Sequence, residues 1–206
     1  MSALYLNQFQ KLLEVEYQCH TVILYGSRSR GTDTPESDFD LIGFSDSKKD
    51  QRIAQVIDGQ YLDAFVYGTD SLNGNEVNFL RIKDGIVLVE RDTLGSELLK
   101  RIEDLYLKGP KTLSSEEIEL QVVWVKKMLG RIKKQDLEGN FRRVWLQHDL
   151  LEMYFSLRGR WYLGPKEGFA WLAAKDLQTL ELFETSLQSP TCIENLNLLS
   201  QRVLLL

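Results

Sequence analysis

The sequence predicts an α+β fold in two parts, a mixed sheet with helices followed by an all-helical bundle. Short apolar runs typical of buried strands recur up to about residue 90, whereas after residue 110 apolar side chains recur only at helical spacing. The charge changes at the same place: residues 1–108 carry 12 basic and 18 acidic side chains, and residues 109–206 carry 13 and 12. We therefore expect one domain over 1–108 and a helical domain over 109–206.

The elements of the first part each have a local signal. Apolar residues at helical spacing predict an N-terminal helix, and β-branched or apolar runs ended by glycine or polar residues predict strands. A polar stretch between two of these runs is expected to form a helix. In order, we expect a helix over 1–18, strands over 21–25 and 39–44, a helix over 47–57, a strand over 61–67, a fourth strand or sheet edge over 85–90, and a helix over 96–107.

The second part begins with a helix-start signal. Ser114 followed three residues later by Glu117 is typical of a capping box, in which each side chain bonds the other's backbone N–H. Helical periodicity then continues almost to the end of the chain. The expected helices cover 115–135, 140–158, 165–187 with a break, and 191–205.

Composition excludes several classes of protein. With 206 residues, of which 43% are hydrophobic, the chain can form the hydrophobic core of one large domain or two small ones. A net charge of -5 argues against an obligate binder of long nucleic acid, while a small anionic ligand remains allowed. Two cysteines and two histidines are too few for a disulfide framework or a His-rich metal site. No apolar run is long enough to span a bilayer and residues 1–10 lack signal-peptide character, so we expect a cytoplasmic protein without membrane association.

Three carboxylates stand out in the expected sheet. Asp38 and Asp40 lie two residues apart on an expected strand, so that both side chains point to one face. Like charges this close favour a cation between them, and Mg²⁺ prefers hard oxygen ligands together with substrate phosphates. Asp63 is centred in another expected strand and supplies a third carboxylate if the two strands are neighbours. Such a set can hold two metal ions for an in-line displacement at phosphorus.

A phosphate-binding segment precedes these acids. Gly26 ends an expected strand, and Ser27 is positioned to cap a short helix over residues 28–30, whose exposed N–H groups attract an anion. The segment is not a P-loop, because no Gly-Lys-[Ser/Thr] follows, and it is not a dinucleotide-binding fingerprint.

The combined pattern resembles the nucleotidyltransferase superfamily of DNA polymerase beta, whose motif is Gly-Ser, a spacer, Asp-x-Asp in a strand and a later strand carboxylate. Gly26-Ser27, ten intervening residues, Asp38-Phe39-Asp40 and Asp63 follow this order. The minimal and aminoglycoside nucleotidyltransferases, which often read Gly-Ser-x-Ala-Arg-Gly, are the most similar members, and Ser29 stands where they have Ala.

The resemblance implies an activity. Asp38 and Asp40 would bind Mg²⁺, with two ions in the site, and Ser27, Gly26 and Arg30 would hold the phosphates of ATP or another nucleoside triphosphate. An acceptor hydroxyl would attack the α-phosphorus and release pyrophosphate, so that a nucleoside monophosphate, AMP in the first place, is transferred. Asp63 would serve as a metal ligand or as the base that takes the hydroxyl proton.

A second resemblance lies in the helical part. Streptomycin and spectinomycin adenylyltransferases are similar in having Arg-x-Trp-Tyr, then a Lys that opens a helix and contacts the nucleotide. The matching residues here are Arg158 or Arg160, Trp161-Tyr162 and Lys166, and the spacer is shorter. This implies a nucleotide-binding role for Lys166 and Arg158, against the alternative that Lys166 is a solvated surface residue.

Several alternatives remain open from the sequence. The acceptor is a small molecule resembling an aminoglycoside or a protein hydroxyl, as in antitoxins that AMPylate proteins. A non-catalytic nucleotide-binding toxin partner is a second class. Arg143 and His148 also fit the loose Arg-x4-6-His pattern of HEPN ribonucleases. The basic run over residues 126–143 is interpreted as a solvated face. The oligomeric state is not determined by these patterns.

Overall fold

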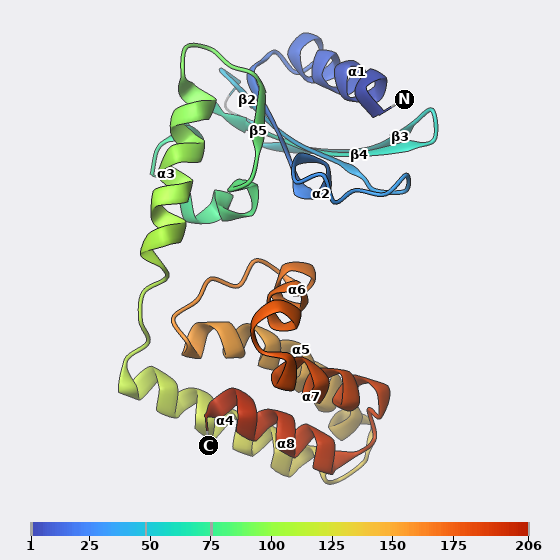
Figure 1. The fold of residues 1–206 in the computed structure, drawn as a ribbon, viewed down its shortest axis with the longest axis vertical. Helices are drawn as coiled ribbons and strands as arrows, with labels where there is room; N and C mark the ends of the chain where they lie inside the picture. Colours follow the sequence, from blue (N-terminus) through green and yellow to red (C-terminus); the bar gives the residue numbers. More distant parts are fainter. Residues whose placement is uncertain (1, 48, 75, 206) are drawn as a thin grey trace. The chain divides into compact units, whose positions relative to one another are not determined.

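The chain divides into two compact units, Met1–Lys108 and Gly109–Leu206, in the computed structural model, which describes residues 2–47, 49–74 and 76–205 (Figure 1). The first unit combines a five-stranded sheet with helices, and the described part of the second unit is helical. The α+β class predicted from the sequence is therefore confirmed. None of the helices in the described ranges has the length and apolar character needed to cross a membrane.

The sheet of the first unit has mixed topology. Its strands lie in the order β3-β4-β2-β1-β5, with β2 and β4 parallel and the other neighbours antiparallel. The two central strands are buried almost throughout, which explains their continuous apolar runs. The strands are β1 (Cys19–Tyr25), β2 (Phe39–Ser45), β3 (Gln51–Ile57), β4 (Gln60–Gly68) and β5 (Ile86–Val89).

Helix α1 (Ser2–Val15) covers one face of this sheet, and α2 (Gly26–Ser29) lies on the opposite side (Figure 1). Phe9 and Leu13 of α1 are fully buried and pack with Leu41 of β2 and Leu62 of β4. The remaining elements of this unit are η1 (Thr69–Leu72), η2 (Glu76–Ile82) and α3 (Leu94–Lys108). Side chains that point to the other face, opposite α1, therefore lie outside the core that α1 covers.

The helix predicted over residues 47–57 is wrong. Residues of this stretch form the edge strand β3, which pairs antiparallel with β4. Asp58 and Gly59 both adopt positive φ, 50° and 79°, between Ile57 and Gln60, as the tight turn of a two-residue hairpin requires. The Asp-Gly pair was the hairpin signal, and the exposed edge position explains the polar composition. Residue 48 of the predicted helix lies outside the described residues.

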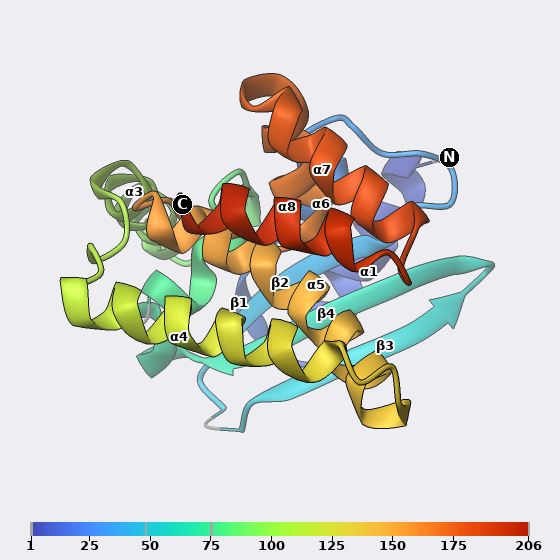
Figure 2. The ribbon, with the colours of Figure 1, turned by 90° about the horizontal axis from the view of Figure 1, so that it is seen from below.

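The second unit packs its helices around one apolar core (Figure 2). The capping box at the start of α4 is confirmed, since Glu117 N donates to Ser114 Oγ and Ser114 N to Glu117 Oε2. The break expected within 165–187 falls at Asp176. The helices are α4 (Ser115–Ile132), α5 (Leu137–Leu157), α6 (Pro165–Lys175), α7 (Leu177–Gln188) and α8 (Ile193–Leu204).

Candidate active site

Two of the expected carboxylates lie side by side on the face of the sheet opposite α1. The parallel register of β2 and β4 sets Asp40 opposite Asp63, and the antiparallel register of β1 and β2 sets Tyr25 opposite Asp40. Directly opposite residues on neighbouring strands point to the same face. Leu41 and Leu62, which alternate with the acids, are buried in the core under α1. The sheet thus brings Asp40 and Asp63 together from positions far apart in the sequence.

Gly26 touches the Asp40 carboxylate. A Cβ atom at position 26 would lie 2.1 Å from Asp40 Oδ2, and the residue has φ +77°, a left-handed conformation that favours glycine. The chain therefore turns from β1 directly against a carboxylate. Ser27 follows as a buried residue inside α2. The expectation that Ser27 caps this helix is wrong, because the turn at Gly26 starts the helix one residue earlier and Tyr25 occupies the N-cap position.

We expect Gly26→Ala to lower activity at least about tenfold, because the new methyl group must displace the Asp40 carboxylate. Gly31→Ala is the matched control. Gly31 also has a positive φ, +66°, but a Cβ there meets nothing within 4 Å. Both variants place alanine at a positive φ, so steady-state kinetics and thermal unfolding of the pair isolate the contact with Asp40. Equal losses of activity in the two variants would contradict this assignment.

β2 begins at Phe39, as predicted, so Asp38 lies immediately before the strand and is exposed, rather than on the strand with Asp40 as expected. Its backbone is held by Arg28, whose Nε donates to the Asp38 carbonyl oxygen at 3.0 Å. The same guanidinium pairs with Asp33 Oδ2 at 3.0 Å and stacks 3.8 Å above the Phe39 ring. Arg28 therefore organises the loop that joins the Gly26 turn to the acidic pair. Sequence reasoning missed this residue, although its place inside the motif was a signal.

Asp63 is engaged by a neighbouring strand. Arg52 of β3 donates from Nε to Asp63 Oδ1 and from Nη2 to Asp63 Oδ2, both at 2.9 Å. This two-pronged hydrogen bond raises the pKa of Arg52 above its already high ordinary value. Both oxygens of Asp63 thus have a cationic partner, which its position in the sequence did not reveal.

The carboxylates of the site suit Mg²⁺ only if phosphate oxygens of a substrate complete its set of ligands. Within the ranges that the structure describes, no three His, Cys, Asp or Glu side chains gather closely enough to hold a metal ion. The Asp38-x-Asp40 pair supplies hard carboxylate oxygens, and Mg²⁺ commonly combines one or two carboxylates with phosphate oxygens and water. The residues present therefore suit a metal that arrives with a triphosphate.

The nucleotide-binding residues expected in the helical unit differ in their surroundings. Arg158 donates to the carbonyl oxygens of Tyr154, Arg202 and Val203 at 3.0–3.1 Å, which satisfies the end of α8. Burial lowers the pKa of Arg158 from its ordinary value. Lys166, the second residue of α6, is exposed and makes no ion pair with another residue of the described ranges.

Arg160 is the other candidate in that segment. It is exposed, and its guanidinium lies 4.7 Å from the centroid of the Trp171 ring. In the first unit, Arg30 ends α2 as its C-cap residue and is half-buried. Arg160 and Lys166 therefore present exposed cations in the helical unit, whereas Arg158 is engaged with backbone.

Arg143 and His148 do not share a helix face. Arg143 is 5% exposed on the core side of α5, and its Nη1 donates to Asn140 Oδ1. The His148 side chain is 73% exposed and hydrogen-bonds Asp149. A pair on opposite sides of one helix cannot act on the same scissile bond, which removes the basis for a ribonuclease site here.

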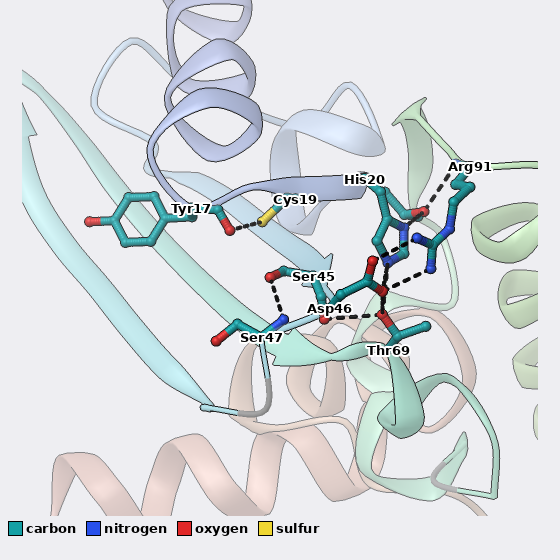
Figure 3. A network of polar contacts seen from close by, with 9 residues as sticks. Tyr17, Cys19, His20, Ser45, Asp46, Ser47, Thr69 and Arg91 are labelled. Atoms are coloured by element: carbon teal, nitrogen blue, oxygen red, sulfur yellow. Dashed lines mark hydrogen bonds and ion pairs between the residues drawn. The ribbon is translucent and has the colours of Figure 1, made fainter.

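A second polar cluster lies at the other end of the central strands (Figure 3). Asp46 accepts from Arg91 Nη1 and Nη2 at 2.9 and 3.0 Å and from Thr69 Oγ1 at 2.8 Å. The hydrogen bonds from Arg91 and Thr69 lower the pKa of Asp46 to about 2. His20 lies between Thr21 and Thr69, at 2.9 Å from each hydroxyl. These contacts link β1, β2 and the segment after β5, so we assign the cluster a structural role.

The His20 network predicts a pH-dependent stability. Burial, helped by the nearby Arg91 and opposed by Asp46, lowers the pKa of His20 from its ordinary 6.5. The folded state thus prefers neutral His20, so its contribution is complete above pH 6.5 and declines as the pH falls below 6.5 toward the folded-state pKa. We expect His20→Gln to reduce the fall in melting temperature between about pH 7.5 and 5.5, and the same substitution at exposed His148 to leave it unchanged. Identical pH profiles for His20→Gln and the unmodified chain would contradict this.

The fold and the site define the class of protein. A Gly-Ser turn against a strand aspartate, followed by a neighbouring strand carboxylate, is the arrangement of a nucleotidyltransferase. The nucleotidyltransferase domain family matches residues 6–116, slightly more than half of the chain, and the chain belongs to this family.

Further comparisons add a structural likeness. A solved nucleotidyltransferase-like protein from Exiguobacterium sibiricum 255-15 is 15% identical to this chain. The match covers 97% of this chain and 73% of that one, with a TM-score of 0.43. No curated protein matches the chain.

Proposed function

We propose that the protein transfers a nucleoside monophosphate, AMP from ATP in the first place, to an acceptor hydroxyl with release of pyrophosphate. The observation that carries this proposal is the close approach of Gly26 to the Asp40 carboxylate, with Asp63 in register beside it. A glycine turn against a strand carboxylate lets a triphosphate backbone come near the acids without a side chain in the way. Family membership supports the same class of reaction.

Each residue of the site then has a role. Asp38 and Asp40 would hold Mg²⁺, which when bound neutralises the charge of the triphosphate and orients it. The α2 turn with Gly26, Ser27 and Arg30 would receive the phosphates. The acceptor oxygen forms a bond to the α-phosphorus, the bond from that phosphorus to the bridging oxygen breaks, and pyrophosphate leaves with the electron pair.

Asp63 would take the proton of the acceptor hydroxyl. Its carboxylate is held in one orientation by the two hydrogen bonds from Arg52. A base that is oriented by a third group is a recurring arrangement in catalysis by proton transfer. Asp63 as a metal ligand, the other role implied by the family, would require Arg52 to release it. Arg52 is therefore a positioning residue in this proposal.

We expect Arg52→Gln to separate two kinetic parameters. Loss of the guanidinium frees the orientation of Asp63, which lowers kcat about tenfold. It also removes a positive charge beside the acids, which lowers the Mg²⁺ concentration for half-maximal activity about threefold. Steady-state kinetics at varied Mg²⁺ measure both parameters. Arg101→Gln, which breaks a similar pair with Glu76 elsewhere in the unit, is the control. A lower Mg²⁺ concentration for half-maximal activity, with kcat unchanged, would instead favour Asp63 as a metal ligand.

The helical unit would contribute to nucleotide and acceptor selection. Lys166 and Arg160 are its exposed cations in the segment that resembles the adenylyltransferases, so we assign the phosphate contacts to them. Arg158 is assigned to the stability of α8, because its donors are engaged with carbonyl oxygens there.

The acceptor class follows from charge. A cluster of carboxylates attracts a cationic, hydroxyl-bearing molecule such as an aminoglycoside. The first unit has 12 basic and 18 acidic residues, which supports a small cationic acceptor over an anionic one. A hydroxyl on a protein is the alternative acceptor.

Pyrophosphate release tests the proposal. The chain is incubated with Mg²⁺, each of the four nucleoside triphosphates and a pooled panel of aminoglycosides, and Asp38→Ala/Asp40→Ala serves as the blank. Release that requires the two aspartates supports nucleotidyl transfer and identifies the nucleotide. The proposal would be overturned if the chain binds a nucleotide but releases no pyrophosphate with either the aminoglycoside panel or a panel of cell proteins. That result would indicate a non-catalytic nucleotide-binding role.

A further inference from the structure

The helical unit exposes apolar side chains on α4 and α5. These two helices pack against each other (Figure 2). Among these side chains, Leu120 is 64% exposed, Val123 55%, Phe141 70% and Trp145 44%. Trp124 joins the two helices by an edge contact with Trp145, with ring centroids 5.8 Å apart. Aromatic side chains gathered on an exposed surface mark interaction sites more often than scattered apolar residues do. We call this set of five residues the α4/α5 face.

An acidic and a basic residue flank the part of this face on α4. Glu116, Leu120, Val123 and Lys127 are spaced by four, three and four residues, so they form one stripe along the helix, and all four are exposed. The order is acid, apolar, apolar, base. Neither Glu116 nor Lys127 has an ion-pair partner among the residues that the structure describes.

This order makes the stripe complementary to itself. When two identical helices pack antiparallel about a two-fold axis between Leu120 and Val123, Glu116 of one copy meets Lys127 of the other, and Leu120 meets Val123. Symmetry forms each of these contacts twice. A parallel pairing would instead set Glu116 against Glu116 and Lys127 against Lys127, which opposes association. The charges thus select both the partner and its direction.

We propose that the protein forms a two-fold symmetric homodimer through the α4/α5 face, with the two α4 helices antiparallel. The occupant of the face is a second copy of this chain, because the charge order along α4 is complementary to its own reverse. The aromatic residues Phe141 and Trp145 of α5 flank the central contact and extend it. Burial of these side chains provides the main driving force, and the ion pairs set the register.

Sedimentation velocity of the full chain over a range of concentrations tests the proposal. We expect a concentration-dependent dimer that Val123→Asp weakens at least about tenfold, because a charge then lies in the apolar centre of the contact. The control is Leu177→Asp, at an apolar residue of α7 that is 58% exposed and lies outside the face. It is expected to leave the dimer unchanged. Circular dichroism melts of each variant confirm that it is folded.

Charge reversal tests the register. Glu116→Lys and Lys127→Glu each set like charges opposite each other twice, and each is expected to weaken the dimer about threefold or more. The double variant restores both pairs with reversed sign and is expected to regain dimerisation. A monomer at all concentrations, a dimer insensitive to Val123→Asp, or a double variant no better than the singles would overturn the proposal. The first of these outcomes would mean that another surface covers the face.

Discussion

Asp40→Asn is expected to lower nucleotidyl transfer by about a thousandfold while the chain remains folded. Asp40 lies at the centre of the site, in register with Asp63 and in contact with the Gly26 turn. Asparagine keeps the size of the side chain and one oxygen, so the packing against Gly26 is preserved. It removes the negative charge with which Asp40 would hold the proposed Mg²⁺ ion. The expected result is therefore a loss of kcat with little change in melting temperature.

The matched control for this substitution is Asp70→Asn. Asp70 is an exposed carboxylate in η1, which follows the end of β4 rather than its start. We expect its kinetics to equal those of the unmodified chain. The result that would count against the site is an Asp40→Asn variant that retains more than about a tenth of the activity, since neither metal binding nor phosphate positioning would then depend on this carboxylate.

Asp176→Ala is expected to destabilise the helical unit by about 3 kcal/mol. The Asp176 carboxylate accepts hydrogen bonds from Tyr154 Oη at 2.7 Å, Thr179 Oγ1 at 2.8 Å and Arg202 Nη2 at 3.0 Å. It also caps the start of α7 through Thr179 N. Its side chain is 15% exposed. Removal leaves a half-buried guanidinium and a phenol without their partner, in addition to an uncapped helix.

Asp136→Ala provides the comparison for that measurement. Asp136 caps α5 by accepting from Gly139 N at 2.7 Å, and it is exposed. Loss of a cap alone is expected to cost about 1 kcal/mol. Chemical denaturation of both variants therefore separates the capping contribution from the Tyr154 and Arg202 contacts. Equal destabilisation by the two substitutions would show that these additional contacts contribute nothing.

Acid should weaken the same network. Burial by itself raises the pKa of Asp176, but hydrogen bonds from Tyr154, Thr179 and Arg202 outweigh it and hold the pKa at about 2, below the ordinary 3.8. A carboxyl with a lowered folded-state pKa stabilises the fold fully above its unfolded pKa and loses that contribution as the pH falls to its folded pKa. The difference in unfolding free energy between Asp176→Ala and the unmodified chain should thus shrink between about pH 4 and pH 2.

Local patterns in the sequence were sufficient for much of the fold. The buried central strands read as continuous apolar runs, and the α4 capping box is a four-residue signal. The helix–strand error at β3 arose because an exposed edge strand has no apolar run of its own. Its identity depends on hydrogen bonds to β4 and on the Asp58-Gly59 turn.

The candidate site divides in the same way. The motif of Gly26, Ser27, Asp38 and Asp40 could be recognised from the sequence because its residues lie close together along the chain. The partners of two expected site residues could not be predicted from the sequence. Arg52 of β3 pairs with Asp63 of β4, and Arg158 donates to the end of α8, more than 40 residues away.

The sequence by itself thus determined the class of fold and the family motif, in which Asp38, Asp40 and Asp63 are the candidate acids. Only the tertiary structure decided that Asp63 meets Arg52 and that Arg158 meets the end of α8, because such contacts depend on strand register and helix packing between distant segments. No spacing of residues along the chain encodes those contacts.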